Sequence, residues 1–282
     1  MKLKARVKLL TFSTQTFRRP QRLLVQSGSR AGISEYATWT QDVLKKTEFY
    51  RKYREILDGG RGAGFWLWKP YLIRAELESL KPGDFLVYYD VGRPEMPNRF
   101  GGTLGPVLDW SVEHGGMFPG VYIPEHGRNA KWTKRECFVL MNCDSDRYWD
   151  HPQVQATFSV WRKSAEAVQT IDEWLSACLI PGVISDEGVL DGVEDFPDFV
   201  DHRHDQSVLT NVVIRRGLDC FGDVHKPIVN PRDINASKDV NVLLGVMRNN
   251  RTTVRLILIR RFVNIAFRRI FFRLKEALHV AT

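Results

Sequence analysis

A carboxylate directly after a buried strand is the first group in this sequence that can do chemistry. The nearly continuous apolar run at 85–89 predicts a strand covered on both faces, and Asp90 follows it. In open α/β sheets, ligands bind at the carboxyl ends of the strands. Asp90, next to Tyr89, can there bind a divalent metal ion, which prefers carboxylate oxygen, or the hydroxyls of a ribose. The alternative is a simple turn, because Asp90 and Gly92 form a common Asp-x-Gly pattern.

A second cluster of reactive side chains lies just before a predicted helix. The segment 201–207 reads Asp-His-Arg-His-Asp-Gln-Ser. His204, Asp205 and Gln206 are the catalytic candidates in it. The plainer alternative is that Asp205 or Ser207 only caps the helix.

Two further motifs offer positive charge to a phosphate group. The segment 61–70 reads Arg-Gly-Ala-Gly-Phe-Trp-Leu-Trp-Lys-Pro, and it places Lys69 close to a predicted helix start. Near the end of the predicted α/β region, His225 and Lys226 precede a proline, and they can serve a metal ion and a phosphate, respectively. The first motif is not a P-loop, because its glycine spacing is different and it lacks the Lys-Ser/Thr end. Its tryptophans also suit core packing.

Alternating strands and helices must position these groups. Strands are predicted at 7–12, 33–38, 85–89, 136–141 and 156–161. Helices are predicted at 20–26, 42–57, 68–80, 164–179 and 207–216, from apolar residues at helical spacing. The acidic segment 186–201 is predicted to be an exposed loop. The alternation favours an α/β domain with a mostly parallel central sheet flanked by helices.

Composition and charge narrow the class of protein. Of the 282 residues, 43% are hydrophobic and 26% are charged, which excludes a disordered or collagen-like chain. The four cysteines are too irregularly spaced for a disulfide framework or a zinc knuckle, and we expect buried thiols in a reducing compartment. The net charge of +8 is unevenly placed, because residues 1–30 and 251–282 are strongly basic and the centre is acidic. Basic ends suit contact with an anionic surface better than they suit nucleic acid.

The last thirty or so residues predict an amphipathic helix. Apolar residues recur every three or four positions from Leu256 to Leu274, opposite a basic face. Arginines without balancing acids, and phenylalanines outside the apolar stripe, favour binding to an anionic membrane over packing on the domain or binding nucleic acid. No run reaches the ~18–20 apolar residues of a membrane-spanning helix. The acid-free start also resembles a mitochondrial transit peptide, although a first strand explains it better.

Taken in order, the motifs resemble those of bacterial GT-A-type glycosyltransferases of surface-polysaccharide (capsule or O-antigen) synthesis. The resemblance spans about residues 5–230 and rests on Gly-Phe-Trp-Leu-Trp-Lys-Pro, Leu-Val-Tyr-Tyr-Asp-Val-Gly, Phe-Val-Leu-Met-Asn-Cys-Asp-Ser and His-Arg-His-Asp-Gln-Ser. It implies a Rossmann-like sheet and a nucleotide-sugar donor, with a UDP-sugar favoured. It also implies a glycan or lipid-linked acceptor.

The resemblance also implies roles for individual residues. If the reaction retains configuration, Asp205 would hold the hydroxyls of the donor sugar, and Gln206 would lie at the far face of its anomeric carbon. If the reaction inverts, Asp205 would be the base that deprotonates the acceptor hydroxyl. Asp90 and His225 would bind Mn²⁺ or Mg²⁺. The donor would further contact residues that follow the first strand or lie near the diphosphate: Thr11, Ser13, Lys69, Tyr89 and Lys226. The family's Asp-x-Asp motif is incomplete here, since Gly92 stands at its second position, and this departure leaves the need for a metal open.

The sequence therefore predicts a catalytic domain at 1–240 and a membrane-associating helix at 250–282. We expect the protein in the cytoplasm, peripheral on the inner face of the cell membrane, with no nucleic-acid partner. Two other functions fit parts of the pattern. One is a metal-dependent hydrolase using Asp90, Asp205 and the two histidines His202 and His204, and the other is a non-catalytic module that binds polyanions through its basic ends.

Overall fold

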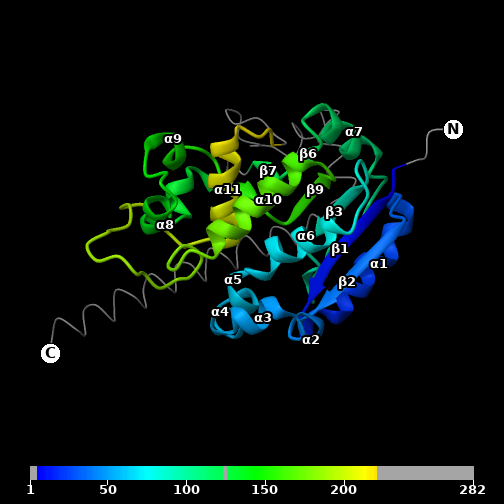
Figure 1. The fold of residues 1–282 in the computed structure, drawn as a ribbon, viewed down its shortest axis with the longest axis horizontal. Coiled ribbons are helices and arrows are strands. Elements are labelled where there is room, and N and C mark those ends of the chain that lie inside the picture. The colour runs from blue at the N-terminus through cyan, green and yellow to red at the C-terminus, as the bar shows by residue number, and fades with distance from the viewer. Residues whose placement is uncertain (1–4, 123–125, 221–282) are drawn as a thin grey trace. The chain divides into compact units, whose positions relative to one another are not determined.

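The computed structural model describes residues 5–122 and 126–220, and its centre is a five-stranded sheet (Figure 1). The strand order is β2-β1-β3-β9-β6. These strands are β1 (Val7–Ser13), β2 (Glu35–Thr40), β3 (Phe85–Tyr89), β6 (Met117–Phe118) and β9 (Phe158–Arg162). β1 pairs in parallel with β2 and β3, whereas β9 is antiparallel to both β3 and β6. All strands except β9 therefore run in one direction, and the expected mostly parallel sheet is confirmed.

Helices cover both faces of this sheet (Figure 1). On one face, apolar side chains of β1, β3 and β9 form a core with α6 (Trp68–Glu78), α10 (Ala165–Cys178) and α11 (Asp205–Arg216). The other face packs against α1 (Arg18–Ala31) and α7 (Gly105–Glu113). Neighbouring residues of a strand point to opposite faces, so Tyr88 belongs to the first core and Tyr89 to the second.

Short elements complete the described chain. The helical ones are η1 (Gln15–Phe17), α2 (Gln41–Leu44), α3 (Glu48–Lys52), α4 (Arg54–Asp58), α5 (Gly62–Phe65), η3 (Asn129–Lys131), α8 (Arg135–Leu140) and α9 (Asp146–Trp149). Two short antiparallel pairs also form: the hairpin of β4 (Gly92–Arg93) with β5 (Met96–Pro97), and the long-range pair of β7 (Val121–Tyr122) with β8 (Val154–Gln155). Within the described ranges, no helix is long and apolar enough to span a membrane.

Two predicted elements are wrong. The run 136–141 forms most of the helix α8 and not a strand, because a short apolar run looks alike in both states and here the amide of Met141 donates to the carbonyl of Cys137, four residues back, as in a helix. The predicted helix 42–57 is three short helices. Between α2 and α3, Thr47 has extended backbone geometry and its hydroxyl caps the start of α3. Between α3 and α4, Tyr53 departs from helical geometry.

The chain divides into two units, Met1–Met247 and Arg248–Thr282. The second unit, which contains the predicted amphipathic helix at 250–282, lies outside the described residues. His225 and Lys226 also lie outside them.

Candidate functional site

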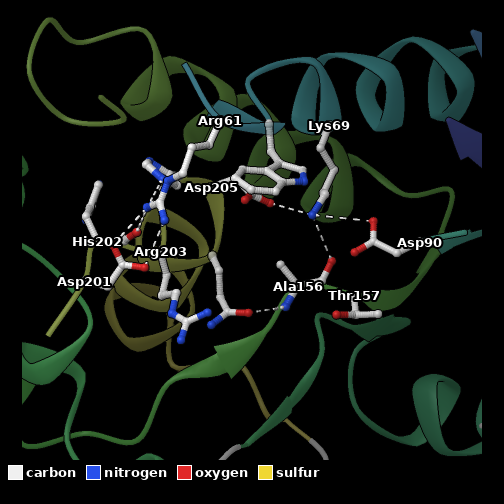
Figure 2. A pocket seen from close by; sticks show the side chains of 12 residues that line it. Arg61, Lys69, Asp90, Ala156, Thr157, Asp201, His202, Arg203 and Asp205 are labelled. Carbon is white, nitrogen blue, oxygen red and sulfur yellow. Dashed lines mark hydrogen bonds and ion pairs between the residues drawn. The ribbon is translucent and has the colours of Figure 1, made fainter. Parts of the chain in front are cut away.

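A polar cavity of about 150 Å³ opens at the edge of the sheet where β3 ends and β9 begins (Figure 2). Its walls come from the segments before α6, after β3, before β9 and at the start of α11. The lining residues are Arg61, Trp66, Lys69, Asp90, Ala156, Thr157, Asp201, His202, Arg203, His204, Asp205 and Gln206. Three of the separately predicted motifs therefore meet at one place, the carboxyl-terminal edge of the parallel strands.

Lys69 lies between the carboxylates of Asp205 and Asp90 in this site (Figure 2). Its Nζ is 2.7 Å from Asp205 Oδ2 and 3.8 Å from Asp90 Oδ1, and it donates a hydrogen bond of 3.3 Å to the carbonyl of Ala156. The side chains of Lys69 and Asp205 are 3% and 5% exposed, whereas that of Asp90 is 30% exposed. Asp90 also accepts a hydrogen bond from the hydroxyl of Tyr88.

Burial and this ion pair set the charge states of the two enclosed groups. Burial raises the pKa of Asp205 to about 6, although the ammonium of Lys69 works in the opposite direction. Burial alone would lower the pKa of Lys69, but the carboxylates of Asp205 and Asp90 outweigh it and raise that pKa. Lys69 is therefore a permanent cation, and Asp205 is a carboxylate that takes up a proton far more readily than an ordinary aspartate. A pKa near the working pH is what general acid–base catalysis requires.

His204 has no nitrogen free for proton transfer. Its Nδ1–H donates to the carbonyl of Ile184 at 2.8 Å, which leaves Nε2 to accept from Arg61 Nη2 at 2.7 Å. Burial lowers the pKa of His204, so the ring is neutral. In this arrangement the His204 side chain ties the start of α11 to Arg61 and to the carbonyl of Ile184, and its catalytic role stays a prediction.

Arg61 is the residue that sequence reasoning missed. It binds both carboxylate oxygens of Asp201 at 3.0 Å, the carbonyl of His202 at 3.1 Å and the ring of His204. These contacts attach the segment before α6 to the segment that carries Asp205. The signal was present, because Arg61 opens the Arg-Gly-Ala-Gly motif.

The backbone around the cavity is strained on both sides. Ala63, Phe65 and Trp66 have φ values of 55°, 52° and 60°, and His204 has 50°; these are four of the five non-glycine residues with positive φ in the described chain. Gly64 lies among them with φ 91°, and a Cβ there would come within 2.5 Å of the Cα of Leu57. Residues held in such conformations cluster at functional sites.

Gln206 is oriented by a buried amide network. Gln153 Nε2 donates to surrounding oxygen atoms, among them Asn129 Oδ1 and Ser207 Oγ. Gln153 Oε1 is therefore the acceptor for Gln206 Nε2, at 2.7 Å. The carbonyl of the Gln206 side chain consequently turns toward Ala156 N, 3.4 Å away, at the cavity wall.

Three predicted donor contacts do not line the cavity. Thr11 and Ser13 are buried on β1, where the Ser13 hydroxyl donates to Gln21 on α1. Tyr89 is buried on the opposite face of the sheet from Lys69, in the core with α1 and α7. Tyr88 is the tyrosine on the correct face, and its separation of two residues from Asp90 was the signal for that.

The described residues do not fit a divalent metal site. Asp90 is the predicted ligand they contain, and the ammonium that it shares with Asp205 already lies 3.8 Å from its Oδ1. The second position of the motif, Gly92, has φ 79°, and a Cβ there would lie 2.6 Å from Asn98 N and from Met96 O, so the turn has no room for a carboxylate. The other predicted ligand, His225, lies outside the described residues.

Comparisons with known proteins add a partial resemblance. No family model and no curated protein matches the chain. Among solved structures, an apo structure of the bifunctional glycosyltransferase WbbM aligns with a TM-score of 0.43 and 12% identity, over 75% of this chain and 38% of that one. The galactosyltransferase LgtC, in complex with donor and acceptor sugar analogues, aligns with a TM-score of 0.33 and 10% identity, over 73% and 70%. These chains are glycosyltransferases, but values this low assign no activity.

Proposed function

We propose that this protein is a glycosyltransferase that moves a sugar from a nucleotide-sugar donor, with a UDP-sugar favoured, to a glycan or lipid-linked acceptor in surface-polysaccharide synthesis. One observation carries the proposal. Lys69, Asp90, Asp205 and Gln206, picked from three distant motifs, line one cavity at the edge of the sheet where ligands bind. The cavity is smaller than the ~300–1,000 Å³ of typical small-molecule sites, so it suits the sugar ring and not the whole donor.

In this proposal Asp205 is the base. Its carboxylate takes the proton of the acceptor hydroxyl, whose oxygen forms a bond to the anomeric carbon of the donor sugar. The bond from that carbon to the diphosphate oxygen breaks, and its electron pair leaves with the diphosphate. Lys69 keeps Asp205 anionic near neutral pH. Gln206 lines the same cavity, and its side-chain carbonyl, which accepts from Ala156 N at the wall, is the polar group proposed to lie near the anomeric carbon as charge develops there.

The metal-dependent hydrolase alternative is disfavoured because the histidines it would use as metal ligands already have other hydrogen-bond partners. His202 accepts a hydrogen bond from Lys134 N at Nδ1 and donates from Nε2 to the carbonyl of Val183, and burial lowers its pKa well below the usual value. Like His204, it has no nitrogen left for a metal ion. The polyanion-binding alternative places binding on the basic ends, so it predicts that Asp90→Ala and Asp205→Ala leave function intact, whereas the transferase proposal predicts near-complete loss in at least one of them.

The test of the function is ligand-induced stabilisation followed by turnover. We expect one nucleotide class among UDP-, GDP-, CMP- and dTDP-sugars to raise the melting temperature by mass action. The donors of that class are then assayed for release of free nucleoside diphosphate, with and without a panel of glycan acceptors. Acceptor-dependent release supports transfer. Release without any acceptor would indicate hydrolysis, and no stabilisation by any class would overturn the proposal.

We also propose that the basic segment 251–282 brings the enzyme to an anionic membrane on the cytoplasmic side, where a lipid-linked acceptor would lie. The segment carries a net charge of +7 and several phenylalanines. Each basic residue near an anionic bilayer contributes on the order of 1 kcal/mol of binding energy. We expect the full chain to sediment with phosphatidylserine vesicles and not with neutral ones, and a chain lacking 251–282 to remain in the supernatant. Loss of folding on truncation would instead indicate a packed helix.

A further inference from the structure

The space between Asp90 and Asp205 is occupied by the side chain of Lys69. The Lys69 ammonium has three N–H groups and three oxygen acceptors within 4 Å: Asp205 Oδ2, Asp90 Oδ1 and the carbonyl of Ala156. It is nearly enclosed, at 3% exposure, and its stem enters from the first turn of α6. The positive charge between the two carboxylates is thus a covalent part of the folded chain and does not have to be bound from solution.

The surroundings of Asp90 reinforce this arrangement. Gly92 closes against the β4–β5 turn, so a side chain at that position would collide with backbone atoms of Asn98 and Met96. Position 92 therefore supplies no carboxylate to pair with Asp90. Its partner is Asp205 from α11, and the two carboxylates share one ammonium ion. A Lys ammonium is a compact point charge, and here it stands where two carboxylates would otherwise hold a metal ion.

We propose that Lys69 takes the place of a divalent cation between these two carboxylates, so that donor binding and sugar transfer by this protein need no divalent metal. This inference rests on the proposed function. Negative charge on the leaving diphosphate is then met by protein cations at the cavity wall. Arg203 is one of these, and its guanidinium is held 4.3 Å above the ring of Trp132.

The experiment compares rates in EDTA with rates in added Mn²⁺ or Mg²⁺, using the full-length protein stripped of metal and the donor class found by thermal stabilisation. We expect rates that agree within about two-fold across these conditions, because the charge supplied by Lys69 is permanent. A loss of about ten-fold or more in EDTA that Mn²⁺ restores would overturn the inference while leaving the glycosyltransferase function standing. If no donor turns over in any condition, the function itself fails, and the metal question falls with it.

A binding measurement gives a readout that does not depend on turnover. Equilibrium dialysis with Mn²⁺ alone is run on the wild type and on Asp90→Asn, whose amide keeps the shape of the side chain. At Mn²⁺ concentrations near those of the cell, we expect both proteins to bind a negligible amount of Mn²⁺. Stoichiometric binding to the wild type that Asp90→Asn abolishes would show a metal site at Asp90 and would contradict the inference.

Discussion

Replacing Asp205 by asparagine is expected to lower kcat for sugar transfer by about 10²–10⁴-fold, the usual contribution of a positioned base. The side chain is almost completely enclosed and its carboxylate contacts Lys69 at 2.7 Å, which distinguishes it from Asp90 in the same cavity, whose side chain is 30% exposed. Asparagine keeps the shape of the side chain but cannot accept the hydroxyl proton as a base. Initial rates at saturating donor and acceptor measure the loss.

The matched control is Asp198→Asn. Asp198 pairs with Arg128 at 2.7 Å, but its side chain is 46% exposed and lies away from the cavity lining. We expect wild-type rates from this variant, because an exposed ion pair contributes little. If Asp205→Asn raises KM and leaves kcat unchanged, Asp205 only holds substrate hydroxyls and is not the base.

The raised pKa of Asp205 leads us to expect that activity rises and stability falls as the pH increases from about 4 to 6. Activity needs the deprotonated form, so kcat/KM should fall about ten-fold per pH unit below the pKa of Asp205, which is about 6. Stability runs the other way. Because the folded-state pKa is raised above the usual 3.8, the folded protein binds more protons than the unfolded chain between about pH 4 and 6, and this group destabilises the fold as pH rises through that window.

Chemical denaturation of the two proteins measures this second effect. A pKa difference of about two units corresponds to about 3 kcal/mol. Asp205→Asn should therefore match the wild type near pH 4 and exceed it in free energy of unfolding, by a margin of that order, at pH 7. Other carboxylates also shape the wild-type curve, so the difference between the two proteins is the quantity to compare. A difference that stays constant from pH 4 to 7 would contradict the raised pKa.

The individual residues of this site, such as Asp90 and Asp205, could be predicted from the sequence, but the contacts among them could not. Asp90 was recognisable because a carboxylate after an apolar run marks a strand end, and Asp205 because it stands in a dense polar motif before a helix. The position of Lys69 between them depends on how α6 packs against β3 and α10, which no local pattern encodes. Tyr88 and Tyr89 show the same limit, since a continuous apolar run hides which residue faces which side.

The differences between the predicted and the observed surroundings of residues have physical causes of a similar kind. His204 looked catalytic because imidazole is the commonest acid–base group, but its two nitrogens are taken by Arg61 and Ile184, which lie far from it in the sequence. The run 136–141 has the composition of a strand, but it packs as a helix, with Cys137 and Met141, four residues apart, both contacting the amide of Asn211 on α11. In both cases a tertiary contact decides what a local preference cannot.

Replacing Lys69 by methionine should expose the dependence of Asp205 on its cation. Methionine fills a similar volume without charge, and it leaves a buried carboxylate unpaired at a cost of about 3–5 kcal/mol of stability. Because Lys69 is what holds the pKa of Asp205 down against burial, its loss should raise that pKa above 6. The acid limb of kcat/KM then moves to higher pH, so activity lost at pH 7 is partly recovered in alkaline buffer. A merely structural role for Lys69 would lower the rate equally at all pH values.

Two further variants separate charge from packing. Lys8→Met removes another paired lysine, whose Nζ lies 3.1 Å from Glu76 Oε2. Lys8 does not line the cavity, so this variant should leave the pH profile of kcat/KM unchanged. The double variant Lys69→Met with Asp205→Asn removes both charges, so it should be more stable than Lys69→Met alone, because no buried carboxylate is left unpaired. If the double variant is the less stable of the two, packing around the Lys69 stem, and not its charge, holds this site together, and Lys69 is no substitute for a metal ion.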